Sequence, residues 1–262
     1  MPAIDVSGTT VSYTTTGEGP GLVFVAGTGM AAELNYGHLT GEFAGSRTVI
    51  LPDYAGSGQS DDPDGPLTVE SLAGQIAAAA RAAAGGNDRV DVVGFSLGAV
   101  VAAGVAALHP ELVGRLVLVA GWPDPDDARH HLAFDLWQGL ERTDHELFAR
   151  FLMLTCFGPP FLSGLGTEGV TALLEGMAPI SAGMRAHMEL DLVADIRDLL
   201  PRIAAPTLVI GLTRDHVIPV ERARLLHDGI AGSEYAEIDT GHMVMFEKPA
   251  EFAGVCRDFL LG

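Results

Sequence analysis

Gly94-Phe95-Ser96-Leu97-Gly98 follows the apolar run Val90 to Val93 and precedes the helix-like stretch Ala99 to Leu108. A strand, a G-x-S-x-G pentapeptide and a helix in this order predict a nucleophile elbow, a sharp turn that exposes the serine hydroxyl above a sheet. Ser96 would then have a strained backbone, and a side chain at 94 or 98 would collide with the neighbouring strand or helix. The pattern makes Ser96 a candidate nucleophile, against the alternative of an ordinary strand-to-helix turn of small residues.

Short apolar runs recur on both sides of this turn and alternate with longer helix-like stretches. Such alternation predicts βαβ units and a parallel sheet that is buried on both faces. The strand-length runs cover residues 22–26, 48–51, 90–93, 116–120 and 207–210, after an antiparallel hairpin of residues 4–7 and 9–15. We expect the main helices at residues 68–84, 97–108, 220–229 and 249–261.

The strand pattern stops between Gly121 and about Pro206, where the sequence becomes helical and carries many aromatic side chains. We expect four short helices there, at residues 126–141, 144–154, 167–177 and 181–200, separated by clusters of glycine and proline. The chain is therefore divided into a sheet domain of residues 1–121 and 206–262 and a helical insertion of residues 122–205.

The aromatic residues of the insertion have two interpretations. They form the core of a packed subdomain, or some of them line a substrate pocket. Trp122, Phe134 and Trp137 lie just after a strand end or within the insertion, where apolar groups can face a pocket above Ser96. These three are the candidate substrate-binding residues.

A serine hydroxyl is a weak nucleophile at neutral pH, so it needs a base and a group that orients the base. Asp215 comes four residues after Gly211, beyond the apolar strand 207–210, and His242 follows Gly241 beyond the strand-like stretch 235–238. Both lie where α/β sheets place catalytic groups. Each alone fits a solvated loop residue or an ion pair. The chain order Ser96, Asp215, His242 predicts a catalytic triad.

Length and charge limit the remaining possibilities. The chain has 262 residues and is 48% hydrophobic, which suits one large α/β domain with an insertion. Its formal net charge of -19 repels phosphate backbones and anionic lipid headgroups, so we expect no nucleic-acid partner and no membrane partner. The N-terminus lacks the basic and apolar regions of a secretory signal, so we expect a cytoplasmic location.

Metal and cofactor sites have little support. Cys156 and Cys256 lie in contexts without CxxC or Cys/His ligand spacing. His130-His131 lies on an expected helix, where adjacent side chains point about a hundred degrees apart and rarely bind one ion. The glycines within Asp53 to Ser60 lack the Gly-Lys-Ser/Thr ending of a phosphate-binding loop. We expect no metal, no cofactor and a small-molecule substrate.

The chain resembles the α/β-hydrolase superfamily over nearly its whole length. The resemblance rests on Gly94 to Gly98, on Asp53 to Ser60 after the second apolar strand, on Gly211 to Asp215, on Gly241-His242, and on His109-Pro110-Glu111 before the next strand. It implies an eight-stranded, mostly parallel sheet flanked by helices, with a helical cap inserted after the sixth strand. It also implies hydrolysis of a carboxylic ester, thioester or lactone. Haloalkane dehalogenases and epoxide hydrolases of this fold carry aspartate as the nucleophile in the elbow. The serine at position 96 therefore argues against these two activities.

The oxyanion hole follows partly from the motif and partly from the resemblance. The amide of Leu97, directly after the nucleophile, is the first expected donor to a tetrahedral intermediate. Ala26-Gly27-Thr28-Gly29 occupies the place of the family's His-Gly-x-Gly, which makes the Thr28 amide the second donor and Gly29 the competing candidate. Ala26 replaces the usual histidine, so the loop lacks one bracing side chain.

Two further choices stay open. The family has a minority arrangement with the acid after the sixth strand, where Asp124 and Asp126 compete with Asp215. The spacing of Asp215 from Gly211, and Pro219 beyond it, favour Asp215.

For the function, the preferred interpretation is a serine hydrolase that forms an acyl-enzyme with a small apolar substrate. The alternatives are a C-C bond hydrolase, lyase, cyclase or cofactor-free peroxidase with the same triad, and a non-catalytic protein that binds a small ligand. Substrate identity and oligomeric state are not determined by the sequence.

Overall fold

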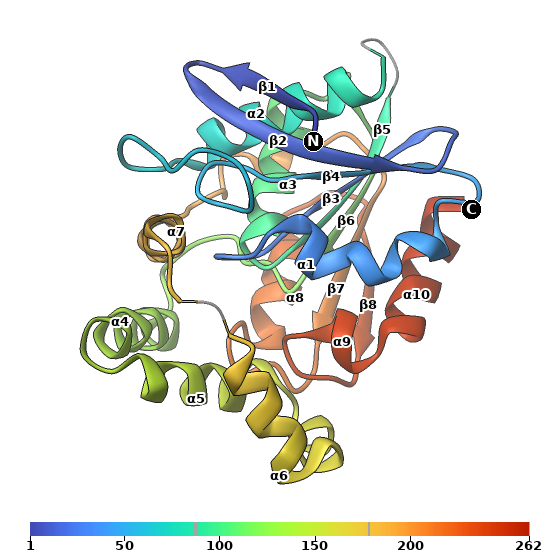
Figure 1. Ribbon diagram of the computed structural model, residues 1–262. Coiled ribbons are helices and arrows are strands. Elements are labelled where there is room, and N and C mark those ends of the chain that lie inside the picture. The colour runs from blue at the N-terminus through green and yellow to red at the C-terminus, as the bar shows by residue number, and fades with distance from the viewer. Residues whose placement is uncertain (86–88, 178, 262) are drawn as a thin grey trace.

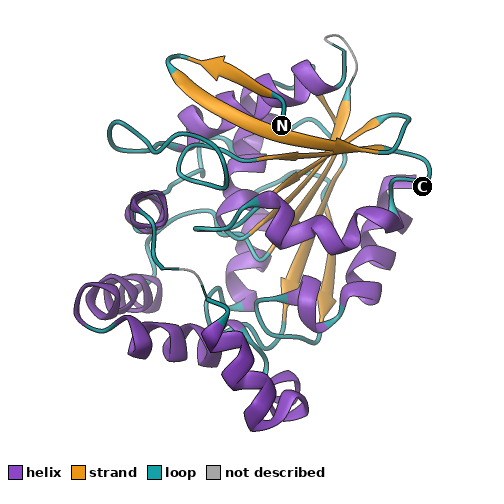
Figure 2. Cartoon of the chain, in the orientation of Figure 1, coloured by secondary structure: helices purple, strands orange, loops and turns teal. Residues whose placement is uncertain are grey.

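An eight-stranded sheet with helices on both faces forms the centre of the molecule (Figures 1 and 2). The computed structural model describes residues 1–85, 89–177 and 179–261. The strand order is β1-β2-β4-β3-β5-β6-β7-β8, in which β2 pairs antiparallel with β1 and β4 and the strands from β3 onward are parallel. The strands are β1 Ala3–Val6, β2 Thr9–Thr16, β3 Gly21–Val25, β4 Thr48–Pro52, β5 Val90–Phe95, β6 Val113–Val119, β7 Thr207–Leu212 and β8 Glu234–Ile238. The predicted fold class, an eight-stranded and mostly parallel sheet flanked by helices, is confirmed.

Each face of the sheet has its own hydrophobic core because successive strand residues point to opposite sides. On β3, Val23 and Val25 pack with α2, α3 and α8, whereas Leu22 and Phe24 pack with α1, α9 and α10. These helices are α1 Ala32–Tyr36, α2 Val69–Ala83, α3 Leu97–Leu108, α8 Val220–Asp228, α9 Val244–Glu247 and α10 Pro249–Leu261, with short 3-10 helices at Gly37–Glu42 and Leu200–Arg202. Nearly every residue of α3 is buried, which fits its run of alanine and valine.

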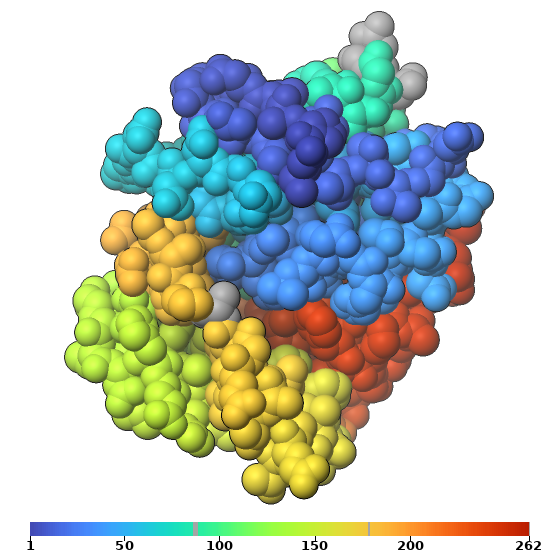
Figure 3. Space-filling model, in the orientation of Figure 1, coloured from blue at the N-terminus to red at the C-terminus, as the bar shows by residue number. Residues whose placement is uncertain are grey.

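The described residues between β6 and β7 form the α-helices α4 Ala128–Thr143, α5 His145–Cys156, α6 Pro159–Glu175 and α7 Ala182–Asp191. Figure 1 shows α4, α5 and α6 together at one end of the molecule, and Figure 3 shows this segment as a continuous lobe against the rest of the surface. Residues 86–88, 178 and 262 fall within the predicted domains and lie outside the described residues. The division at residues 122 and 205 stays a prediction.

Two of the expected helices in the insertion have different bounds. α6 consists of two helical pieces, because Gly166, with φ of 65° and ψ of 179°, is not helical. The second piece follows Gly166, where the helix of residues 167–177 is expected, and the first piece, which begins with Pro159 in its first turn, was not predicted. The helix expected over residues 181–200 ends at Asp191, after which the chain turns and the Ile196 amide donates to the Pro123 carbonyl at 2.8 Å. Periodicity alone did not distinguish this buried turn from a continuing helix.

Three short helices were not predicted. α1, α9 and the 3-10 helix Gly37–Glu42 have five, four and six residues, too few to show a helical period. No helix in the described ranges is both long enough and apolar enough to span a membrane.

Candidate active site

Ser96 lies in a sharp turn between β5 and α3. Its backbone has a φ of 56° and a ψ of -124°, a conformation that residues other than glycine rarely adopt. A Cβ atom added to Gly94 would overlap the carbonyl of Gly98, and one added to Gly98 would overlap the carbonyl of Val25. The strained turn and both close approaches expected from the sequence are therefore present.

Ser96, His242 and Asp215 form one hydrogen-bonded chain. The Nε2 atom of His242 lies 3.1 Å from the Ser96 hydroxyl, and its Nδ1 atom lies 2.6 Å from Oδ2 of Asp215. The three residues follow β5, β8 and β7, whose carboxyl ends meet at one edge of the parallel sheet. They are only 5%, 4% and 7% exposed. This arrangement can transfer the serine proton to an imidazole that a carboxylate orients.

The loop after β7 holds the carboxylate of Asp215 in place. Its Oδ1 atom accepts hydrogen bonds from the amides of Val217 and Ile218 at 2.8 and 2.9 Å, which leaves Oδ2 for His242. Charge-assisted bonds from backbone amides are strong and fix the side-chain rotamer. Asp215 is therefore placed to select the tautomer of His242 that carries its proton on Nδ1.

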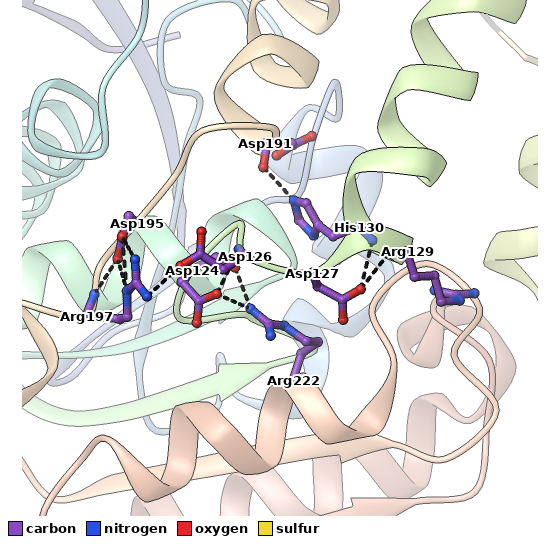
Figure 4. A network of polar contacts seen from close by, with 9 residues as sticks. All are labelled: Asp124, Asp126, Asp127, Arg129, His130, Asp191, Asp195, Arg197 and Arg222. Atoms are coloured by element: carbon purple, nitrogen blue, oxygen red, sulfur yellow. Dashed lines mark hydrogen bonds and ion pairs between the residues drawn. The ribbon is translucent and has the colours of Figure 1, made fainter.

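The two competing acids are bound to arginines (Figure 4). Asp124 accepts from Arg222 of α8 at 2.9 Å, and both side chains are buried. Asp126 pairs with Arg197 at 2.7 Å on the surface. Neither acid contacts His242 in the described part of the chain, so the geometry favours Asp215 as its partner.

The loop after β3 runs directly over Ser96, because a Cβ atom on Gly27 would lie 3.3 Å from the Cβ of Ser96. The Gly29 amide donates to Nδ1 of His187 at 3.1 Å. In contrast, the amides of Thr28 and Leu97 donate to no acceptor among the described residues. Leu97 is the first residue of α3, where an amide has no partner within the helix. The two predicted oxyanion donors are thus free, and the competing Gly29 amide is occupied.

Several side chains that support this loop were not found from the sequence. Asn35 accepts from the Gly27 amide at 3.1 Å, and Tyr54 donates to the Ala26 carbonyl at 2.8 Å. Asp191 accepts from the Thr28 hydroxyl at 2.8 Å. Only Tyr54 lies in a motif that carried the resemblance. The others are single polar residues in apolar or helical surroundings, with no local signal to identify them.

Trp122, Phe134 and Trp137 belong to one buried aromatic cluster. The rings of Phe134 and Trp137 are 5.0 Å apart, and the cluster extends from Phe134 to Trp122 at 6.3 Å and from Trp137 to Phe148 at 6.2 Å. All three predicted residues are part of the larger hydrophobic core. Their burial shows a packing role, and contact with a substrate stays a prediction.

The His130-His131 pair has separate environments. Nε2 of His130 hydrogen-bonds the Asp191 carbonyl at 2.7 Å (Figure 4). The rings of His130 and His131 lie at 84° to each other. Burial lowers the pKa of His130. In the ranges that the structure describes, no group of three or more His, Cys, Asp or Glu side chains is placed to hold a metal ion.

A large open groove lies elsewhere, between α5 and α6. Its volume is about 990 Å³, and Phe148, Leu162, Val170 and Leu174 are among its lining residues. None of the predicted site residues lines it. Cavity size alone would therefore point away from Ser96.

Comparison with known proteins identifies the family. A family model described as "Alpha/beta hydrolase family" matches residues 22–255. The chain is 41% identical to a pyrrolizixenacetamide deacetylase of Xenorhabdus hominickii, over 100% of this chain and 98% of that protein. It is 31% identical to a putative carbamate hydrolase, RutD, of Rhizobium rhizogenes, over 66% of this chain and 67% of that protein. The crystal structure of an enol-lactonase from Burkholderia xenovorans LB400 has the same fold, with a TM-score of 0.86 at 23% identity and complete coverage of both chains. The chain belongs to the alpha/beta hydrolase family.

Proposed function

We propose that the protein is a serine hydrolase that removes an acyl group from a small apolar substrate through an acyl-enzyme on Ser96. The observation that carries this proposal is the buried chain of hydrogen bonds from Ser96 to His242 at 3.1 Å and from His242 to Asp215 at 2.6 Å. The free amides of Thr28 and Leu97 support it, because acyl transfer needs donors for a developing oxyanion.

The first half of the reaction forms the acyl-enzyme. Oγ of Ser96 attacks the substrate carbonyl while Nε2 of His242 takes the hydroxyl proton. The carbonyl oxygen becomes an oxyanion that accepts hydrogen bonds from the amides of Thr28 and Leu97. The bond to the leaving group then breaks, and His242 gives its proton to the alcohol, thiol or amine that departs.

The second half releases the acid. Water loses a proton to Nε2 of His242 and attacks the acyl carbon, and a second oxyanion forms at the same two amides. The bond to Oγ breaks and Ser96 regains its proton from His242. Asp215 stays ionised throughout and stabilises the imidazolium that forms in each half.

The substrate class combines the sequence with the relatives. A carboxylic ester, thioester or lactone is expected from the resemblance. A relative that aligns over 98% of its own length is named as a pyrrolizixenacetamide deacetylase, and another relative is named as a putative carbamate hydrolase. These names support amide-type acyl groups as well as ester-type ones. An acetyl group on a small apolar amine or alcohol is therefore the first substrate class to test.

The helical insertion acts as a cap in this proposal. A Cβ atom on Gly29, in the loop after β3, would meet the side chain of Met184 of α7, and a Cβ atom on Gly183 of α7 would overlap the backbone of Gly56. These contacts support a role for residues 122–205 in enclosing the substrate. The cytoplasmic location and the lack of a nucleic-acid partner stay predictions from the sequence.

The experiment compares wild type with Ser96→Ala on acetyl, butyryl and hexanoyl p-nitrophenyl esters, N-acetyl arylamides, acyl-thioesters and lactones. Intact-mass spectrometry during turnover should detect the substrate acyl group on Ser96. Turnover that persists in pure Ser96→Ala would remove the serine from the mechanism. Turnover in wild type without any acylated serine would favour a lyase, cyclase or peroxidase reaction with the same residues.

A further inference from the structure

We propose that helix α7 positions the oxyanion loop through His187 and Asp191, so that the active site is complete only while α7 is seated on residues 27–29. This inference rests on the proposed function and deepens it. Both residues would be positioning residues, because they act on the substrate only through the loop.

Two neighbouring residues of the loop bind two residues of one helix. His187 and Asp191 are four residues apart, so they lie on the same face of α7. Nδ1 of His187 accepts from the Gly29 amide at 3.1 Å, and Oδ2 of Asp191 accepts from the Thr28 hydroxyl at 2.8 Å. Both helix residues are 0% exposed. Buried polar pairs of this kind fix geometry because no water can replace a lost partner.

The second nitrogen of His187 determines what the first can do. Nε2 lies 2.8 Å from the Ala55 carbonyl, which only accepts hydrogen bonds, so Nε2 carries the proton. Nδ1 is then the acceptor that the Gly29 amide requires. Burial supports this neutral state, since it lowers the pKa of His187 to about 4. The ring therefore bridges two loops, one next to Ser96 and one after β4.

Glycines allow the helix to lie this close. Gly29 has φ of 69° and would meet the Met184 side chain if it carried a Cβ atom. A Cβ atom on Gly183 of α7 would overlap the backbone of Gly56. The backbones of α7 and of the loop at Gly56 are therefore in direct contact. If α7 moved away from the sheet, the Gly29 amide and the Thr28 hydroxyl would lose their partners together.

The consequence concerns the direction of the Thr28 amide. Ala26 offers no polar side chain to hold the loop from within. Because His187 binds the Gly29 amide, that peptide faces α7, and the preceding amide of Thr28 stays available to the oxyanion. Oxyanion donors contribute through preorganisation, so a loop that loses these contacts should lose transition-state stabilisation more than substrate affinity.

Matched substitutions separate this role from simple packing. At position 187, Asn keeps an acceptor near Nδ1 for Gly29, whereas Gln keeps a donor near Nε2 for Ala55. Because only Asn keeps the acceptor for the Gly29 amide, the kcat of His187→Asn should be at least about tenfold higher than that of His187→Gln. At position 28, Val removes the hydroxyl but keeps the amide and the shape. Thr28→Val should lower kcat about tenfold with less than about a threefold change in KM, and Thr28→Ser should retain more kcat than Thr28→Val.

The controls cover both folding and the proposed function. Glu189→Gln changes an exposed residue of the same helix and should leave kcat unchanged. Active sites are counted by fluorophosphonate labelling. A trifluoromethyl ketone adds to Oγ of Ser96 and forms a hemiketal whose oxyanion occupies the same position as that of the reaction intermediate. Inhibition by this ketone should weaken in parallel with kcat/KM. If Ser96→Ala is inactive but Thr28→Val and His187→Gln keep wild-type kcat for each labelled site, the α7 inference is wrong and the hydrolase proposal stands. If wild-type Ser96 does not label and Ser96→Ala turns over, the hydrolase proposal itself fails.

Discussion

Arg222 of α8 donates a hydrogen bond of 2.9 Å to the carboxylate of Asp124, and both side chains are buried. This pair links the exit of β6 to a helix that follows β7, and it occupies the acid that competes with Asp215 for His242. A buried arginine that loses its partner is strongly destabilising. Asp124 should therefore matter for stability, and Asp215 for chemistry.

Asp215→Asn should keep the fold and lower turnover on the order of ten-thousand-fold, because it stabilises the wrong tautomer of His242 and removes the charge opposite the imidazolium. Asp124→Asn should instead lower the free energy of unfolding by about 3 kcal/mol or more while the folded fraction stays active. Asp126→Asn removes an ion pair on the surface, so it should change neither turnover nor the free energy of unfolding by much. Kinetics and urea unfolding on the three variants test this, and an active Asp215→Asn beside an inactive Asp124→Asn would reverse the assignment.

The backbone of Ser96 predicts a gain in stability when its side chain is removed completely. Ser96→Ala and Ser96→Gly should both lower turnover about a million-fold. Alanine keeps the strain of a φ of 56°, whereas glycine adopts this conformation freely. The free energy of unfolding of Ser96→Gly should therefore be about 1 kcal/mol higher than that of Ser96→Ala. Equal unfolding curves for the two variants would show that the turn carries no strain.

Asp191 predicts a pH dependence of stability. Burial raises the pKa of its carboxyl from 3.8 to about 8, so between these values the folded protein holds a proton that the unfolded chain has released. The free energy of unfolding therefore falls as pH rises from about 4 to 8, by at most about 1.4 kcal/mol per pH unit from this group. Asp191→Asn removes that dependence while its amide oxygen can still accept from Thr28.

Unfolding of wild type and Asp191→Asn by urea at pH 5, 6, 7 and 8 measures the difference directly. The advantage of the Asn variant should increase with pH across this window. A constant difference would mean that Asp191 has an ordinary pKa in the folded protein.

The aromatic cluster predicts separate effects on stability and on substrate choice. Phe134→Ala should lower the free energy of unfolding by about 3–5 kcal/mol because it leaves a cavity beside Trp137, and Phe134→Leu should cost less. If the cluster also lines the substrate pocket, Phe134→Leu and Trp137→Phe should change the preference among acyl chain lengths more than the rate of labelling by a small phosphonate. Unchanged preference in the folded variants would leave the cluster with a packing role alone.

The sequence by itself determined the features that depend on local chain geometry. Gly94 and Gly98 identify the elbow because no other residue fits their positions, and the apolar runs of β3 to β7 identify a parallel sheet through their length and spacing. The order of Ser96, Asp215 and His242 along the chain predicted a contact that the structure contains.

Only the tertiary structure decided which partners the remaining polar groups take. Asp191 and His187 reach Thr28 and Gly29 across about 160 residues, and Arg222 reaches Asp124 across 98. These pairs depend on how the helical insertion folds back onto the sheet, and the end of α7 at Asp191 was itself not visible in the periodicity. Local patterns record backbone conformation and burial, whereas contacts between distant segments follow from the packing of whole helices, which no short stretch of sequence contains.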